Sequence, residues 1–124
     1  MKILIAEDEP IMLMALETSL KREGYTVLTT NDGREALFQI EEFKPDLLIT
    51  DIMMPFTSGL ELIGIVKSTP HLKIPVIVVS GIGQEAIVLE AFKMGADDFL
   101  TKPFNPAELL TRVKRLLQNN EKDS

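Results

Sequence analysis

The sequence predicts an α/β fold in which an open parallel sheet of five strands is covered by helices on both faces. Short runs rich in Val, Ile and Leu recur along the chain, and segments with the apolar spacing of helices separate them. The middle runs lack polar alternation, which indicates strands that are buried on both faces. Because short connections between parallel strands require right-handed crossovers, this alternation predicts a doubly wound, three-layer domain.

The five strands are predicted where aliphatic residues cluster. In chain order these runs are residues 2–6, 25–30, 46–50, 76–80 and 97–101. Aliphatic and β-branched side chains pack well on a pleated, buried surface, which favours strands for runs this short.

Four of the helices are predicted from apolar residues that recur three or four positions apart. These residues are Leu13, Leu16 and Leu20, then Ala36, Leu37 and Ile40, then Ile87, Ala91 and Met94, and finally Leu109, Val113, Leu116 and Leu117. The punctuation agrees with them. Pro10 suits a first helical turn, Gly24 and Gly95 follow predicted helix ends, and Asn105 followed by Pro106 suits an N-cap and a first turn.

A further helix, the third in chain order, is predicted over Gly59–Ser68. Its pattern is the weakest, because Gly64 interrupts it and Pro70 disfavours helix at the preceding Thr69. With it the chain has five helices. We predict one domain at residues 1–119, followed by a flexible polar tail at residues 120–124.

Composition excludes several classes of function. The chain of 124 residues has no cysteine, which rules out disulfides and thiolate chemistry, and no apolar run near the roughly 20 residues of a membrane span. We therefore expect a soluble, cytoplasmic protein without membrane contact. The net charge of −6 opposes nucleic-acid binding by this domain. The nearest approach to a basic cluster, Arg112, Lys114 and Arg115, suits the last turns of a helix better than a nucleic-acid site.

Polar residues gather at the ends of the predicted strands, where functional groups of doubly wound sheets lie. Glu7 and Asp8 follow the first strand, and Asp51 follows the third. Ser80 ends the fourth strand, and Lys102 follows the fifth. If the first and third strands are neighbours, three acids, a hydroxyl and an amine share one edge of the sheet.

This set of groups favours phosphoryl chemistry at a metal ion. Carboxylates lie close together only if one is protonated or a cation neutralises them, and hard oxygen ligands favour Mg²⁺, or Mn²⁺ in its place. Lys102 supplies a second positive charge for phosphoryl oxygens. Attack of the Asp51 carboxylate on phosphorus would then give an acyl phosphate, with no general base required.

These residues resemble the receiver domain of bacterial two-component response regulators. The resemblance rests on the Glu7–Asp8 pair, the segment DIMMP at 51–55 with Gly59 after it, Ser80, and the segment DFLTKP at 98–103. Their order and spacing match over essentially the whole chain. The resemblance implies a flavodoxin-like sheet with strand order 2-1-3-4-5 and a regulatory phosphoacceptor that is not an enzyme.

The resemblance also implies partners and metal ligands. The phosphoryl donor would be a phosphohistidine on a sensor histidine kinase or a histidine phosphotransfer protein, and Asp51 would accept the group. Asp8, Asp51 and the backbone carbonyl of Met53 would bind Mg²⁺, and Glu7 would act through water. An effector, or a second copy in a homodimer, would read the phosphorylated state.

Further roles follow from the same resemblance. Ser80 would bond a phosphoryl oxygen and Lys102 would pair with phospho-Asp51. The peptide bond between Lys102 and Pro103 would be cis. Phe99 would be the second switch residue, turning inward as Ser80 moves. Two residues beyond Asp51 and Ser80 stand Met53 and Ile82, at the positions that tune hydrolysis of the acyl phosphate. Both are apolar here, which predicts slow self-dephosphorylation.

The output surface is predicted on the face formed by the fourth helix, the fifth strand and the fifth helix. The fourth helix is apolar on more sides than one core requires, so we assign Val88 and Phe92 to this face; burial against neighbouring loops is the alternative. His71, in the loop before the fourth strand, is interpreted as an exposed residue and not as a phosphoryl donor.

Taken singly, each site residue has an ordinary structural interpretation. The acids at 7–9 suit a helix start, Asp51 a turn, Ser80 a bond to backbone, Lys102 a solvated surface and Phe99 the core. Three other functions compete with a phosphoacceptor: a phosphatase of the haloacid dehalogenase type, a flavodoxin-like cofactor binder, and an interaction module that is never phosphorylated. The phosphatase places its nucleophile after the first strand, and acids at 7–9 would repel a cofactor phosphate.

Overall fold

The computed structural model describes residues 1–54 and 57–122, with side chains through residue 118. Within these residues, strands and helices alternate along the chain and confirm the predicted fold class. The elements are β1 (Lys2–Ala6), α1 (Pro10–Arg22), β2 (Thr26–Thr30), α2 (Gly33–Glu42), β3 (Leu47–Asp51), α3 (Gly59–Ser68), β4 (Val76–Ser80), α4 (Glu85–Lys93), β5 (Asp98–Thr101) and α5 (Pro106–Lys122).

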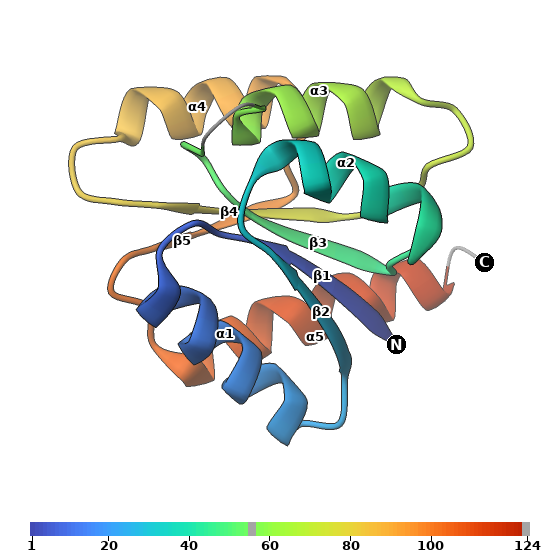
Figure 1. The fold of residues 1–124 in the computed structure, drawn as a ribbon, viewed down its shortest axis with the longest axis vertical. Helices are drawn as coiled ribbons and strands as arrows, with labels where there is room; N and C mark the ends of the chain where they lie inside the picture. The colour runs from blue at the N-terminus through green and yellow to red at the C-terminus, as the bar shows by residue number, and fades with distance from the viewer. Residues whose placement is uncertain (55–56, 123–124) are drawn as a thin grey trace.

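The strands form one parallel sheet in the order β2-β1-β3-β4-β5, as the resemblance implies. Figure 1 shows α1 and α5 against one face, and α2, α3 and α4 against the other. Each face has its own apolar core: Ile3 and Ile5 pack toward α1 and α5, whereas Leu4 and Ala6 pack toward the other helices. Burial on both faces explains why the central strands have no polar alternation.

The start of α3 is fixed tightly against the end of β3. Ser58 and Glu61 form a capping box, in which the Ser58 hydroxyl accepts the Glu61 N–H at 3.2 Å. A Cβ at Gly59 would overlap the carbonyl oxygen of Asp51, so glycine is required where the helix passes the strand end. These local features form the predicted helix despite Gly64 in its middle.

The helix boundaries also agree with the predicted signals. Pro10 lies in the first turn of α1, and Gly24 and Gly95 adopt positive φ angles of 93° and 113° just beyond α1 and α4. The Asn105 side chain accepts the Ala107 N–H at 2.8 Å where α5 begins. The α5 backbone continues to Lys122, past the start of the predicted tail; the domain boundary stays a prediction, and residues 123–124 lie outside the described residues.

Candidate functional site

The carboxylates predicted to converge do meet at the carboxyl edge of the sheet. Because Ala6 pairs with Thr50 in the β1–β3 ladder, the residues that follow these strands are neighbours. One carboxylate oxygen each from Glu7, Asp8 and Asp51 lies within 4.8 Å of the others. Glu7 is 1% exposed and Asp51 6%, whereas Asp8 is open to solvent. The cluster is therefore buried on one side and accessible on the other.

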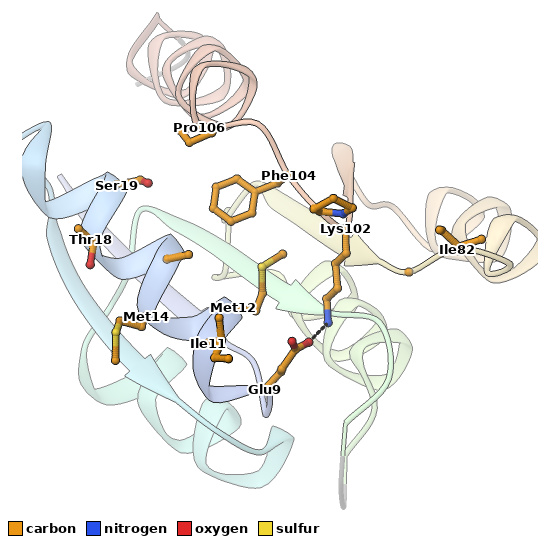
Figure 2. A pocket seen from close by; sticks show the side chains of 13 residues that line it. Glu9, Ile11, Met12, Met14, Thr18, Ser19, Ile82, Lys102, Phe104 and Pro106 are labelled. Carbon is orange, nitrogen blue, oxygen red and sulfur yellow. Dashed lines mark hydrogen bonds and ion pairs between the residues drawn. The ribbon is translucent and has the colours of Figure 1, made fainter.

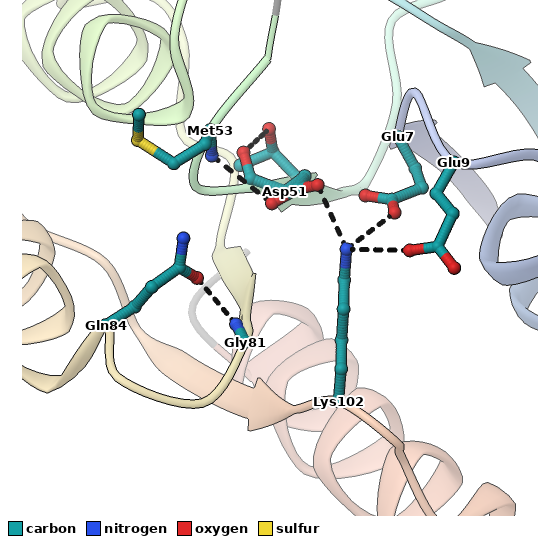
Figure 3. Close-up of polar contacts among 8 residues, drawn as sticks. Glu7, Glu9, Asp51, Met53, Gly81, Gln84 and Lys102 are labelled. Atoms are coloured by element: carbon teal, nitrogen blue, oxygen red, sulfur yellow. Dashed lines mark hydrogen bonds and ion pairs between the residues drawn. The ribbon is translucent and has the colours of Figure 1, made fainter.

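Lys102 follows directly after β5, and its side chain extends toward this cluster. Its Nζ donates to Glu7 Oε1 at 2.8 Å and to Asp51 Oδ2 at 3.1 Å, and it also contacts Glu9 Oε2 at 3.4 Å (Figure 3). The Lys102 N–H donates to the Ser80 carbonyl at 2.8 Å, which ties the start of this segment to β4. The bond between Lys102 and Pro103 is cis, the isomer that the resemblance implies.

The balance of charge at the site remains negative. Burial, together with the neighbouring Asp51 carboxyl group, raises the pKa of Glu7 to about 8, and the contact with Lys102 only partly opposes this. Burial alone would lower the pKa of Lys102, but its bonds to Glu7 and Asp51 more than offset burial and raise that pKa. One ammonium group thus faces several carboxylates, and Glu7 stays protonated more readily than an exposed glutamate.

A buried oxygen at the centre of the site lacks a partner. Glu7 Oε2 is inaccessible to solvent and accepts no hydrogen bond from any residue that the structure describes. An unpaired buried carboxylate oxygen is costly unless a proton or a cation satisfies it. The ligand atoms at hand are hard carboxylate oxygens, with no histidine or cysteine among them, so the donor set fits Mg²⁺ or Mn²⁺.

Asp51 is held from two directions. Its Oδ1 accepts the Met53 N–H at 3.2 Å, and its Oδ2 accepts from Lys102. The backbone around Met53 therefore turns toward the cluster while the Met53 side chain is 52% exposed. Pro55, part of the segment that carried the resemblance, lies outside the described residues.

Ser80 and Phe99 lie on β4 and β5, on the side of Asp51 away from Glu7. Asp51 pairs with Val79 in the β3–β4 ladder, so Ser80 lies one position beyond it. Ser80 is buried, and together with Phe99 it lines a cavity of about 300 Å³ beneath α4. Ile82, in contrast, projects from the loop after β4 and is almost fully exposed.

Part of the predicted output face is corrected by the structure. Val88 is buried in the core rather than exposed, because it lies on the side of α4 that meets the sheet. Phe92 is 38% exposed and packs edge-on against Phe99, with ring centroids 5.9 Å apart. His71 is exposed as predicted and contacts Glu41 at 3.1 Å.

The basic residues of α5 take part in ion pairs with acids. Arg112 and Arg115 both bind the buried Asp98, at 2.6 and 2.8 Å, and Lys114 lies 3.5 Å from Glu23. This arrangement supports the helix-end interpretation over a nucleic-acid site.

The sequence interpretation missed two polar residues near the site. Glu9 contacts Lys102, and Gln84 accepts the Gly81 N–H through Oε1 at 2.5 Å, which fixes the loop after β4 (Figure 3). The signal for Gln84 was its place three residues beyond Gly81 and just before α4, a spacing typical of side-chain capping of turns.

A groove of about 840 Å³ borders the site between α1 and the segment that follows β5. Figure 2 shows Lys102 and Phe104 on one side of it, and Ile11, Met12 and Thr18 on the other. Its rim is apolar, because Ile11 is highly exposed there.

Among the described residues, no helix is both long and apolar enough to cross a membrane.

Comparisons with known proteins bear on the whole chain. A model of the response regulator receiver domain matches residues 3–114. The chain is 38% identical over 120 residues to alkaline phosphatase synthesis transcriptional regulatory protein PhoP of Bacillus subtilis, covering 97% of this chain and 50% of that protein. It is 39% identical over 117 residues to chemotaxis protein CheY of Thermotoga maritima, covering 93% and 96%. It thus spans about half the length of the first relative and nearly all of the second.

A solved structure with the same fold gives a consistent result. The receiver domain of Francisella response regulator 1452 matches with a TM-score of 0.86 and 34% identity, over 95% of this chain and 97% of that one.

Proposed function

Because the chain belongs to the response regulator receiver domain family, we propose that Asp51 accepts a phosphoryl group from a phosphohistidine of a sensor kinase or phosphotransfer protein. The observation that carries this proposal is the environment of Asp51. Its carboxylate is buried, oriented by the Met53 N–H and Lys102, and placed among more acids than nearby bases balance. Such a surplus favours binding of a cation together with an anionic phosphoryl group.

Phosphoryl transfer at this site needs little covalent chemistry from the protein. One Asp51 oxygen forms a bond to phosphorus while the bond from phosphorus to the donor's imidazole nitrogen breaks, and the imidazole leaves with that electron pair. Lys102 Nζ, already 3.1 Å from Asp51 Oδ2, stabilises the charge that develops on the phosphoryl oxygens. The chain promotes its own modification and acts as a regulator rather than as an enzyme on other substrates.

We assign the metal ligands to the residues of the cluster. Asp8, Asp51 and the backbone carbonyl of Met53 would hold Mg²⁺, with Mn²⁺ as a substitute, and Glu7 would contribute through water. A bound divalent cation would neutralise the carboxylates and the phosphoryl oxygens. The unpartnered Glu7 Oε2 and the accessible Asp8 support this assignment.

We propose that Ser80 and Phe99 carry the signal from Asp51 to the output face. Ser80 would donate to a phosphoryl oxygen, and Phe99 would move into the cavity that the two residues share. The face formed by α4, β5 and α5 would then bind an effector or a second copy of the chain. Some relatives are about twice as long as this chain. We therefore include a further domain of the same protein among the effectors proposed to bind this face.

The phosphodonor must reach Asp51 from the open edge of the sheet. The groove beside α1 lies at that edge and contacts Lys102, and its apolar rim suits a protein surface rather than a small polar donor. We propose it as part of the surface that receives the donor protein.

Intact-mass analysis after treatment with acetyl phosphate tests the proposed function. With Mg²⁺ the natural protein should gain one phosphoryl group, and omission of Mg²⁺ should greatly slow the gain. Asp51→Asn should gain none, since the amide is no nucleophile. Asp46→Asn is the matched control, because Asp46 bonds the Lys2 N–H at the opposite edge of the sheet.

Each outcome of this experiment is decisive. A mass gain that persists in Asp51→Asn would place the modification elsewhere. No gain in the natural protein would favour the interaction module that is never phosphorylated.

A further inference from the structure

Arg112, on α5, contacts two residues of β5 whose side chains lie on opposite faces of the sheet. β5 is an edge strand, and its successive residues Asp98 and Phe99 point to opposite faces: Asp98 toward α5, and Phe99 toward the core beneath α4. Arg112 nevertheless contacts both. Its Nη1 donates to Asp98 Oδ1 at 2.6 Å, and its guanidinium carbon lies 5.8 Å from the centre of the Phe99 ring.

The guanidinium group of Arg112 is fixed in this position by a second acid. Glu108, one turn earlier on α5, accepts from Arg112 Nε at 3.1 Å and from Nη2 at 2.9 Å through the same oxygen. The planar fork is therefore bound at both ends, and a face of it remains for the aromatic ring. Arg112 is preorganised for a cation–π contact with Phe99.

Phe99 has a second position available to it. In the structure its ring lies between Arg112 and Phe92, which it meets edge-on at 86°. The ring also lines the cavity of about 300 Å³ that reaches Ser80 and Val88. That volume has room for a phenyl ring, and the contact with Arg112 is one that the ring would give up on entering it.

We propose that Arg112 is a positioning residue that holds Phe99 at the outer end of this cavity and so sets how readily the phosphorylation switch turns. This inference rests on the proposed function of Asp51 and adds a regulatory residue to it. Asp98 and Glu108 anchor the guanidinium group, and the guanidinium group retains the ring. The inward state then competes directly with an ion-pair network on the face formed by α4, β5 and α5.

Substitution of Arg112 by methionine tests the proposal, because methionine keeps an unbranched chain but removes the charge. Nuclear Overhauser contacts from the Phe99 ring to Ser80 and to Phe92 report the position of the ring in the unphosphorylated protein. An exposed cation–π contact predicts an increase of about 2- to 5-fold in the inward population of Arg112→Met. Phosphorylation by acetyl phosphate with Mg²⁺ should accelerate in the same proportion.

Arg115→Met is the matched control. Arg115 also binds Asp98, at 2.8 Å. Among the described residues, the cation–π contact with Phe99 is made by Arg112 and not by Arg115. The control should leave the ring contacts unchanged. Glu108→Gln frees one end of the Arg112 fork and should shift the ring in the same direction by less, which keeps the test available if Arg112→Met does not fold.

The outcomes separate this inference from the proposed function. Unchanged ring contacts in Arg112→Met, or in Glu108→Gln where only that variant folds, would overturn the role of Arg112 even if Asp51 is phosphorylated. Equal shifts in Arg112→Met and Arg115→Met would also overturn it, since they would indicate general loosening around Asp98. Failure of the natural protein to be phosphorylated would instead contradict the function of Asp51, whatever the ring does.

Discussion

Two buried acids at the ends of this sheet have opposite surroundings. At the amino end of β5, each oxygen of Asp98 accepts from an arginine, and Oδ1 also accepts the Phe99 N–H at 2.8 Å. At the carboxyl end of β1, one oxygen of Glu7 accepts from Lys102, and the other has no partner among the described residues. Both acids are nearly inaccessible to solvent, so burial alone does not separate them.

Their pKa values move in opposite directions because the two acids differ in how many donors they have. Burial works to raise the pKa of Asp98, but the bonds from Arg112, the Phe99 N–H and Arg115 outweigh it, and the pKa falls below its ordinary value. Burial raises the pKa of Glu7 to about 8, and the single ammonium group of Lys102, which Glu7 shares with Asp51, only partly opposes this. A saturated buried acid indicates a structural role, whereas one with an unpartnered oxygen indicates a site that binds a ligand.

Removal of Lys102 should have the largest effect on function. Lys102→Met deletes the donor to Asp51 while keeping an unbranched side chain, and phosphorylation by acetyl phosphate should slow by about 10²- to 10³-fold, as for loss of one preorganised donor. Time courses of intact mass measure this. Lys67→Met is the control, because Lys67 binds Asp97 at 2.8 Å at the other edge of the sheet. An unchanged rate in Lys102→Met would remove Lys102 from the reaction.

Removal of Asp98 should instead affect stability. Asp98→Asn leaves two arginines without their shared partner, and because both are partly exposed we expect a loss of about 2 kcal/mol at neutral pH, below the value for a fully buried pair. The lowered pKa means that Asp98 stabilises the protein above the pKa it has when unfolded, and that this contribution is lost as pH falls through the folded pKa. The difference between the variant and the natural protein should therefore shrink in acid.

Urea unfolding at neutral pH and in acid measures this dependence. Glu7→Gln is the contrasting variant, since it replaces an unpartnered buried carboxylate by a neutral amide and should cost little or stabilise the protein without Mg²⁺. If both variants lose equal stability, the distinction between the two acids is wrong.

The sequence was sufficient to predict the fold because two signals agreed. Alternating apolar runs and helical periodicity set the element order, and every observed strand begins and ends within one residue of its predicted run. The rule that locates function at the carboxyl ends of parallel strands also predicts that Glu7, Asp8 and Asp51 lie together, as they do. The strand order and the cis bond came from the family resemblance instead.

What the sequence could not supply depends on side-chain direction and long-range pairing. Val88 was assigned to the surface because α4 is apolar on several sides, and periodicity alone does not decide which side meets the sheet. The pairing of Asp98 with Arg112 joins residues from different elements, and Arg112 reaches around the edge strand to Phe99. Such contacts depend on rotamers and on the packing of α5, which a one-dimensional pattern does not encode.

Binding of Mg²⁺ should distinguish the acidic cluster around Glu7 from the ion pairs of Asp98 through stability. At about ten times its dissociation constant, Mg²⁺ should raise the free energy of unfolding by about 1.4 kcal/mol, because the ion binds only the folded site. Asp8→Asn should lose this gain, and Asp98→Asn should keep it despite its lower starting stability. Thermal unfolding with and without Mg²⁺ measures both, and a gain that survives Asp8→Asn would move the ion away from the cluster.

The smallest predicted effect concerns the lifetime of phospho-Asp51. Met53 and Ile82 border the site with exposed apolar side chains, which cannot orient a water molecule for attack on the acyl phosphate. The double variant Met53→Asn with Ile82→Glu should speed decay by about 2- to 10-fold, the worth of one ordinary hydrogen bond. Intact-mass decay after removal of acetyl phosphate measures it, with Ile65→Glu and Phe38→Asn on α3 and α2 as exposed controls. Equal decay in all variants would mean that solvent already reaches phosphorus unassisted, and that the lifetime depends on Lys102 and the metal ion instead.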